Sequence, residues 1–185
     1  LHITVTPVND PPVITGHRAL SVSEDNTITL LLTDLTVTNS DNVYPIGFSL
    51  AVLPATGYTV SGNAITPGLD FTGVLNVSVK VNDGQEDSAP FTVQVTVAPV
   101  NDAPQIVGQQ PVSTNENLLI PLAFSHFSVS DADNVYPTGF TLLVFSGANY
   151  TVSGSIVTPS TGFSGTLTVP VQVNDGGLNS NVFEM

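Results

Sequence analysis

Apolar and polar residues alternate with a period of two along most of the chain, and helical periodicity is almost absent. Such alternation is typical of strands that bury one face. In the first half it covers five runs: Ile28, Leu30 and Leu32; Phe48, Leu50 and Val52; Tyr58 and Val60; Leu75, Val77, Val79 and Val81; and Phe91, Val93, Val95 and Val97. Turn-forming residues separate the runs at intervals of about 8–12 residues, so the sequence predicts an all-β protein.

The second half of the chain repeats the first half, without a gap, after 92 residues. Pro7–Pro12 has a near copy at Pro99–Pro104, and Val81–Gly84 has one at Val173–Gly176. This self-similarity, at the size of one small domain, indicates a tandem repeat. About seven strands per repeat predict two Greek-key β-sandwiches, at residues 7–98 and 99–185.

The two ends of the chain are out of phase with these repeats. Leu1–Val5 align with Val93–Val97, and Met185 aligns with Val93. We therefore interpret residues 1–6 as a last-strand remnant of a preceding repeat, and the last strand of repeat 2 as truncated, with an open edge. Leu1–Val5 of one molecule are predicted to complete the open sheet of another in head-to-tail self-association. Pro170 interrupts the last long run and predicts a bulge or an unpaired stretch.

The charge balance excludes several classes of function. The sequence contains fifteen acidic residues and only two cations, Arg18 and Lys80, and its net charge is −13. Nucleic acids and anionic membranes require basic patches, so neither is an expected partner. There is no cysteine, and the three histidines are isolated in the sequence, so no nucleophile and base form a recognisable pair. We expect an extracellular protein that is not an enzyme and does not insert into a membrane.

Most acidic residues fall in short motifs at the predicted strand ends, where carboxylates without cations should repel one another. Calcium (Ca2+) is the expected remedy, because it accepts six to eight oxygen ligands in irregular geometry. The best-furnished site comprises Asn101, Asp102, Asp131, Asp133 and Asp175, with Glu24 and Asp70 approaching it from the preceding domain. A weaker site comprises Asn9, Asp10, Asp41 and Asp83. Two alternatives stay open: Val-Asn-Asp-Gly as a plain hairpin turn, and Asp41 and Asp133 as turn caps.

These motifs resemble those of bacterial cadherin-like domains, along essentially the whole chain. The cadherin linker Asp-x-Asn-Asp-Asn-x-Pro is partly matched by Val100–Pro104, and the Asp-Ala-Asp loop is present at Asp131–Asp133. The early glutamate, the Leu-Asp motif and the late aspartate are matched at Glu24 and Glu116, Leu69 and Asp70, and Asp83 and Asp175. The resemblance implies Greek-key sandwiches whose calcium-bound linkers stiffen an array.

The chain also departs from the cadherin pattern. Pro99 and Ala103 replace linker ligands, Thr72 replaces a glutamate, Asn39 opens the loop of repeat 1, and Gly162 stands in place of Asp70 in repeat 2. Fewer ligands predict one or two ions at the central joint. The resemblance implies a surface module for adhesion or spacing, whose partners are neighbouring repeats or other cadherin-like domains. The alternative is a polysaccharide-binding module, in which Tyr58 and Tyr150 would stack on sugars.

Overall fold

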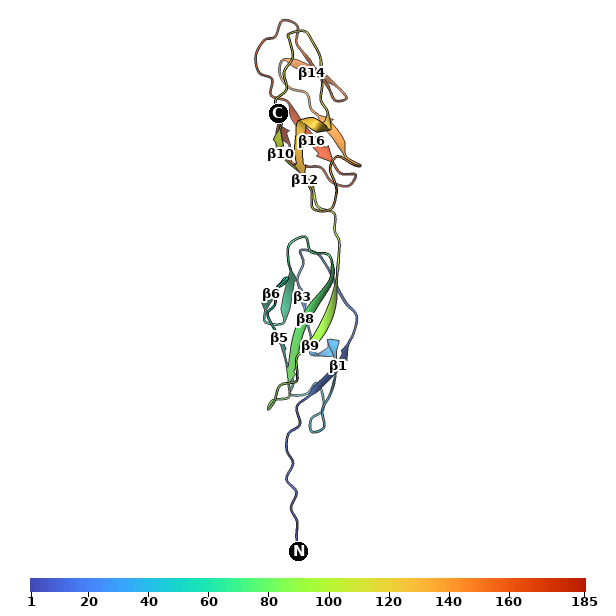
Figure 1. Ribbon diagram of the computed structural model, residues 1–185, viewed down its shortest axis with the longest axis vertical. Helices are drawn as coiled ribbons and strands as arrows, with labels where there is room; N and C mark the ends of the chain where they lie inside the picture. The colour runs from blue at the N-terminus through green and yellow to red at the C-terminus, as the bar shows by residue number, and fades with distance from the viewer. The chain divides into compact units, whose positions relative to one another are not determined.

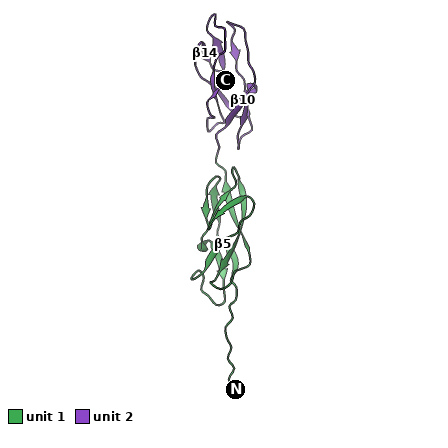
Figure 2. Ribbon diagram, turned by 90° about the vertical axis from the view of Figure 1, so that its left-hand side faces the viewer, with its two compact units in different colours: residues 1–100 green, residues 101–185 purple.

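The computed structural model describes residues 1–185, and the chain divides into two compact units (Figure 2). Unit 1 is Leu1–Val100 and unit 2 is Asn101–Met185. Both units are all-β, which confirms the predicted fold class. The only helical segments are two single turns of 3₁₀ helix, η1 (Leu32–Asp34) and η2 (Phe124–His126). Neither could cross a membrane, and no longer helix is present.

Unit 1 is built from nine strands in three hydrogen-bonded groups (Figure 1). The strands are β1 (Val13–His17), β2 (Leu20–Ser23), β3 (Ile28–Thr29), β4 (Leu35–Thr38), β5 (Ser49–Val52), β6 (Tyr58–Ser61), β7 (Ala64–Pro67), β8 (Gly73–Asn82) and β9 (Phe91–Ala98). One sheet has the order β2-β9-β8-β5, a second has the order β3-β7-β6, and β1 pairs with β4. The long strands β8 and β9 are antiparallel, whereas β2 runs parallel to β9.

Unit 2 repeats this plan with eight strands. They are β10 (Gln105–Gln109), β11 (Ile120–Pro121), β12 (Phe127–Ser130), β13 (Thr141–Val144), β14 (Tyr150–Ser153), β15 (Ile156–Pro159), β16 (Pro170–Asn174) and β17 (Phe183–Glu184). The sheets have the orders β13-β16-β17 and β11-β15-β14, and β10 pairs with β12. No counterpart of β2 forms, β16 lacks the first half of β8, and β17 is much shorter than β9.

Each unit has its own hydrophobic core. The alternating valines of β8 and β9 point inward in unit 1, and six of them are at most 1% exposed: Val77, Val79, Val81, Val93, Val95 and Val97. Val171 and Val173 take the same role in β16 and are completely buried. Burial of each such side chain contributes about 1.5–3 kcal/mol, so these strands carry much of each unit's stability.

The predicted strand Ile28–Leu32 is wrong beyond its first residues. β3 ends at Thr29, and the chain turns through η1 because the Asp34 carboxylate accepts the Leu31 N–H at 2.8 Å. Asp34 is only 2% exposed, and Arg18 Nε donates to it at 2.6 Å. The same turn recurs as η2 in unit 2, where a histidine replaces the aspartate. A side chain that bonds the backbone locally thus overrides the alternation.

Pro170 marks the beginning of β16, and residues 165–169 form no strand. In unit 1 the N–H at the equivalent position, that of Ser78, donates to the Tyr58 hydroxyl at 3.4 Å. A proline here removes that donor to a side chain, which explains why it is tolerated inside a sandwich. The predicted bulge or unpaired stretch is not found at Pro170 itself, because Pro170 is paired with Glu184 and Val169 exchanges two backbone hydrogen bonds with Met185.

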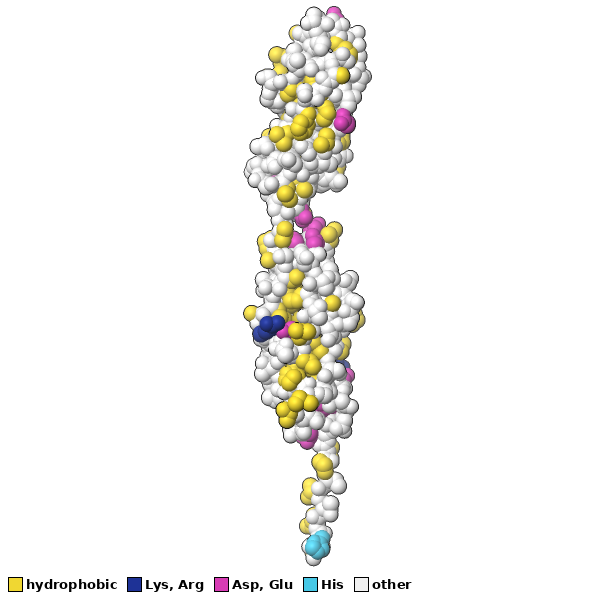
Figure 3. Space-filling view, turned by 180° about the vertical axis from the view of Figure 1, so that it is seen from behind, with side chains coloured by type: hydrophobic (Ala, Val, Ile, Leu, Met, Phe, Trp, Pro, Cys, Tyr) yellow, Lys and Arg dark blue, Asp and Glu magenta, His cyan; other side chains and the backbone are white.

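Residues 1–12 form no strand. Leu1, Ile3 and Val5 are 113%, 79% and 88% exposed, and apolar side chains stand free along this N-terminal segment in Figure 3. Its assignment as the remnant of a preceding strand stays a prediction.

Candidate metal centre

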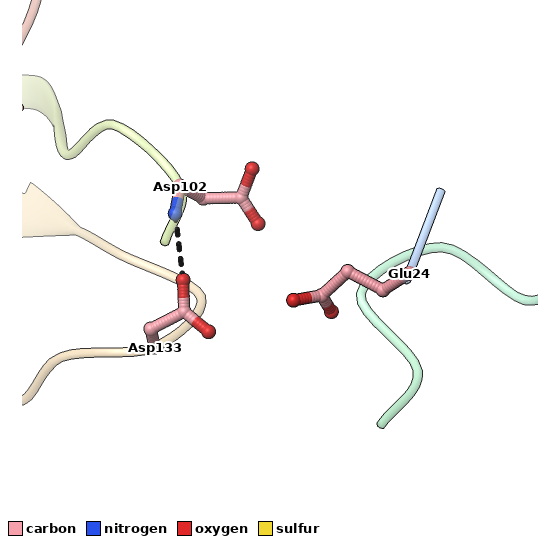
Figure 4. A group of neighbouring side chains, drawn as sticks. All are labelled: Glu24, Asp102 and Asp133. Carbon is pink, nitrogen blue, oxygen red and sulfur yellow. Dashed lines mark hydrogen bonds between the residues drawn. The ribbon is translucent and has the colours of Figure 1, made fainter. Parts of the chain in front are cut away.

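Three segments of unit 2 bring oxygen-rich side chains to one end of its sandwich. They are the start of the unit at Asn101 and Asp102, the loop that follows β12, and the turn that follows β16. The Asp102 N–H donates to the Asp133 carboxylate at 2.7 Å (Figure 4). Asn101 Nδ2 donates to Asp175 Oδ2 at 2.9 Å, and Asn134 Nδ2 donates to Asn101 Oδ1 at 3.1 Å. Carboxylate oxygens of Asp102 and Asp133 lie within 4.8 Å of each other.

Two of these carboxylates hold their own loops with one oxygen each. Asp131 Oδ1 accepts the N–H groups of Asp133 and Asn134 at 2.9 and 2.7 Å. Asp175 Oδ1 accepts those of Gly177 and Leu178 at 2.6 and 2.7 Å. These are Asx-type turns, which shape the loop and leave the second oxygen of each carboxylate directed elsewhere.

The expected turn-capping role falls on a different residue from the one predicted. Asp131 in unit 2 and Asn39 in unit 1 cap the turn, whereas Asp133 and Asp41 accept N–H groups from the residues that enter the unit. The sequence could not assign these roles to the first or the last residue of the loop, because Asp and Asn both form Asx turns. Asn134 was also missed as a contact of the site, although its copy at Asn42 was visible in the repeat.

The second oxygen of Asp131 distinguishes this end of unit 2 from the corresponding end of unit 1. Asp131 Oδ2 is buried and has no hydrogen-bond partner. In unit 1 the equivalent residue is Asn39, whose Oδ1 makes the same turn and whose Nδ2 donates to the Asp10 carbonyl at 3.0 Å and to Asp83 Oδ2 at 3.2 Å. Unit 2 therefore has an oxygen acceptor where unit 1 has an amide donor between two acceptors. A buried acceptor without a partner is costly unless a cation binds it.

The corresponding end of unit 1 is closed by its own amides. Asn9 Nδ2 donates to Asp83 Oδ2 at 3.1 Å, and Gln85 Nε2 donates to Asn9 Oδ1 at 3.2 Å. The Asp10 N–H donates to Asp41 at 2.8 Å. The structure thus brings together all four residues predicted for the weaker site: Asn9, Asp10, Asp41 and Asp83. The carboxylates of Asp41 and Asp83 both accept hydrogen bonds from neighbouring N–H groups.

Both groups of side chains favour ionised carboxylates. Hydrogen bonds from the Glu86 and Gln85 N–H groups lower the pKa of Asp83 below its ordinary value. The Leu178 N–H, followed by Asn101, does the same to the pKa of Asp175. Unit 2 contains no Lys or Arg that could offset this charge; its acidic residues are Asp102, Glu116, Asp131, Asp133, Asp175 and Glu184.

The two remaining predicted ligands, Glu24 and Asp70, lie at the opposite end of unit 1 and contact different residues. Glu24 is 2% exposed; its N–H donates to the Ala98 carbonyl at 2.9 Å, and its carboxylate accepts the Val100 N–H at 2.6 Å. Asp70 contacts Asp25, which accepts the Asp70 N–H at 3.2 Å and has a carboxylate oxygen within 4.8 Å of an Asp70 oxygen. Sequence reasoning missed Asp25, whose signal was its position directly after Glu24.

Tyr58 and Tyr150 do not form a stacking surface, which contradicts the expectation placed on them. They are 7% and 5% exposed, and their hydroxyls donate to the Leu53 and Phe145 carbonyls at 2.7 and 3.0 Å. Burial raises the pKa of Tyr150. Each ring fills a core, and each hydroxyl satisfies a backbone carbonyl.

Comparison with known proteins supports the same architecture. Residues 9–96 match the family model described as a bacterial Ig domain. The chain is similar to the crystal structures of the protocadherin gammaB4 extracellular domain and of the human desmocollin-1 ectodomain, with TM-scores of 0.51 for both and identities of 17% and 15%. Each alignment covers 97% of this chain, which spans 32% and 37% of the two structures. No curated protein sequence matches the chain.

Proposed function

Since the chain carries a bacterial Ig-like domain and has a cadherin-like fold, we propose that it is a calcium-binding module of an extracellular bacterial protein. Its role is structural rather than catalytic. Calcium binds at the end of unit 2 that holds Asp131, and the bound ion restrains the chain where it enters the unit. A linker that is restrained in this way would serve adhesion or spacing at the cell surface.

The observation that carries this proposal is the buried, unpartnered Oδ2 of Asp131. The Asx turn fixes this oxygen, because Oδ1 is already engaged by two backbone N–H groups. In this proposal the carboxylates of Asp133 and Asp175, which accept hydrogen bonds from Asp102 and Asn101, supply further oxygen ligands. A cation would satisfy the orphaned oxygen and offset the negative charge at once.

The donor set favours calcium among the cations. All candidate ligands are oxygens, from carboxylates, the Asn101 amide and backbone carbonyls, which are the ligands of hard cations. There is no cysteine for a softer metal. The group is irregular and exceeds the one or two carboxylates that magnesium usually takes, whereas calcium accepts six to eight oxygens in flexible geometry.

Restraint of the linker follows from the identity of the ligands. Asn101 and Asp102 belong to the segment that joins the two repeats, so an ion held by them also holds the linker backbone. One residue earlier, Val100 donates its N–H to the buried Glu24. The linker is therefore anchored by a glutamate on the unit 1 side, and in this proposal by calcium on the unit 2 side.

The test is thermal unfolding of the chain in EDTA, in magnesium and in calcium. Calcium at a hundredfold excess over Kd should add about 2.7 kcal/mol to the stability of unit 2, which raises its Tm by roughly 10–20 °C. The key variant is Asp131→Asn, which gives unit 2 the amide of unit 1. It should unfold at a higher temperature than the parent in EDTA and should lose the calcium shift.

Glu184→Gln is the matched control, because it removes one exposed carboxylate of unit 2 on β17, outside this group. It should keep the full calcium shift. Identical melting curves of the parent in EDTA and in calcium would overturn the proposal, and so would a calcium shift that Asp131→Asn leaves intact. The polysaccharide alternative has no structural support at Tyr58 and Tyr150.

A further inference from the structure

In unit 1 the chain passes from one hydrogen-bonded group of strands to another between His17 and Leu20. β1 pairs with β4 as far as His17, which lies opposite Leu35. The Arg18 N–H then donates to the Asp34 carbonyl at 2.9 Å, and from Leu20 onward the chain runs parallel to β9 and pairs with it. Only two residues separate β1 from β2, so the contacts made at this crossing fix where β2 begins.

The imidazole of His17 bonds the backbone on both sides of the crossing. Nδ1 lies 2.7 Å from the Arg18 carbonyl oxygen, and Nε2 lies 3.3 Å from the backbone nitrogen of Gln94 in β9. A carbonyl only accepts and a backbone N–H only donates, so Nδ1 carries the proton and Nε2 is the acceptor. The ring also makes an edge contact with Phe91 of β9, with centroids 6.2 Å apart. Both hydrogen bonds therefore require the neutral imidazole in a single tautomer.

The bond from Gln94 extends the ladder between β2 and β9. Leu20 is opposite Val95, so Gln94 lies directly before the first residue of β9 that pairs with β2. Nε2 of His17 takes the place of a backbone carbonyl at this position. β2 has only four residues, so one bond at its beginning is a substantial part of what holds the strand to β9.

β2 leads directly to Glu24, which bonds the segment that follows β9. The Glu24 N–H continues the ladder to the Ala98 carbonyl at 2.9 Å, and its carboxylate accepts the Val100 N–H at 2.6 Å. Glu24 is 2% exposed, and β2 immediately precedes it in the chain. The bond to Val100 therefore depends on β2 lying against β9.

We propose that His17 is a pH-sensitive latch that holds β2 on β9, and that through β2 it holds the bond between Glu24 and Val100. When the imidazole takes up a proton, Nε2 becomes a donor that faces the Gln94 N–H, and the hydrogen bond is lost. A free imidazole changes charge between about pH 8 and pH 5. The latch is therefore closed in the neutral form and opens as the pH falls. It needs no calcium and is separate from the site at Asp131.

The charged groups close to the imidazole are those of Arg18 and Asp34. Arg18 follows His17 in the chain, and its Nε donates to the buried Asp34 carboxylate at 2.6 Å, so the two charges offset each other. The strands in contact with His17, β4 and β9, contain no charged or titratable residue. β1 and β2 contain none besides His17 itself. Loss of the bond on acidification is therefore assigned to His17.

Hydrogen exchange of the whole chain at pH 7.0 and at pH 5.0 tests the latch, with rates corrected for the intrinsic effect of pH on exchange. EDTA is present throughout, so the result does not depend on calcium binding. In the parent, the amides of β2, Gln94 and Val100 should lose about 2-fold to about 13-fold in protection at pH 5.0, which corresponds to one hydrogen bond.

His17→Gln should abolish this response, because its amide offers a donor and an acceptor that do not titrate. The repeat places a glutamine, Gln109, at the same position of unit 2. The variant retains Arg18, Asp34 and Glu24, so any response of these groups to pH stays in it. His2→Gln is the matched control, since His2 is exposed in a segment without strands, and it should respond as the parent does.

Nitrogen NMR of the imidazoles in the parent is the second measurement, and it requires no variant. At pH 7.0 the His17 ring should carry its proton on Nδ1. A proton on Nε2 at that pH would be incompatible with the latch. Equal protection of the parent amides at the two pH values would also rule it out, and so would an equal loss of protection in the parent and in His17→Gln.

Discussion

Replacement of Asn39 by Asp should destabilise unit 1 in the absence of calcium, because it creates there the arrangement found in unit 2. The Asn39 amide donates to the Asp10 carbonyl and to Asp83 Oδ2. In Asn39→Asp the turn-forming oxygen is retained, whereas the donor becomes a carboxylate oxygen that faces two acceptors. One nitrogen atom is in effect exchanged for one oxygen atom, with little change in volume.

The expected cost has two parts. Loss of two hydrogen bonds from a half-buried amide costs about 0.5–1.5 kcal/mol each. The new charge lies close to that of Asp83, which is only 7% exposed, and repulsion between unit charges at 4 Å ranges from about 1 kcal/mol in water to about 4 kcal/mol near a protein surface. Relaxation of the exposed loop offsets part of the sum, so we expect about 2–4 kcal/mol.

Hydrogen exchange in EDTA measures this cost in unit 1 alone, because amides of β8 and β9 exchange through unfolding of that unit. A loss of 2–4 kcal/mol should accelerate their exchange by about 30-fold to about 900-fold. Calcium should restore much of the protection. Ser40→Asp is the control, since it adds the same charge to the same loop at an exposed position. Equal exchange in Asn39→Asp and the parent, or an equal loss in Ser40→Asp, would refute the reasoning.

Three further predictions concern pH, packing and hydrogen bonding. The folded-state pKa of Asp175 lies below 3.8, so the stability it contributes is complete above its unfolded pKa and is lost as the pH falls through the folded value; urea midpoints in EDTA between pH 6 and pH 2.5 should decline below about pH 4, and less so in Asp175→Asn. Val95→Ala should cost about 2–3 kcal/mol in urea unfolding because it opens a cavity in a fully buried site, whereas Val74→Ala, at a position 55% exposed, should change stability by less than about 0.5 kcal/mol. Tyr58→Phe should cost about 1 kcal/mol through an unsatisfied carbonyl, and Tyr150→Phe should cost less, because the proline that faces it has no N–H.

The alternation of apolar residues was sufficient to predict the fold class and the long strands. The inward-facing apolar residues of β8 and β9 alternate over seven residues in each strand, and burial alone decides which face they turn inward. The repeat then transferred each assignment to unit 2. It also predicted that Asp133 and Asp175 lie near Asn101 and Asp102. Residues at strand ends must lie near one another when those ends meet at the same end of a sandwich.

Local hydrogen bonds decided what the pattern could not. Leu32 fits the apolar alternation, yet the buried carboxylate of Asp34 holds the backbone in a turn and ends the strand. Asn39 and Asp131 form the same turn through Oδ1, so the sequence gives them the same role. They differ at the second terminal atom, Nδ2 in Asn39 and Oδ2 in Asp131, and only the structure shows what surrounds that atom. Tyr58 was considered as an exposed stacking residue, because no sequence signal shows whether an aromatic ring at a strand end turns inward.

The positions of the two basic residues determine where a protease that cuts after Arg or Lys can cleave the folded chain. Unit 2 offers such enzymes no site at all. Lys80 lies within β8, paired with Ala51 of β5 and followed by the fully buried Val81, so its peptide bond cannot enter an active site while unit 1 is folded. Arg18 lies between β1 and β2 with its side chain 64% exposed, although Asp34 holds its guanidinium. Digestion with trypsin should therefore cut the native chain after Arg18 alone, and cleavage after Lys80 becomes a direct measure of how often unit 1 opens.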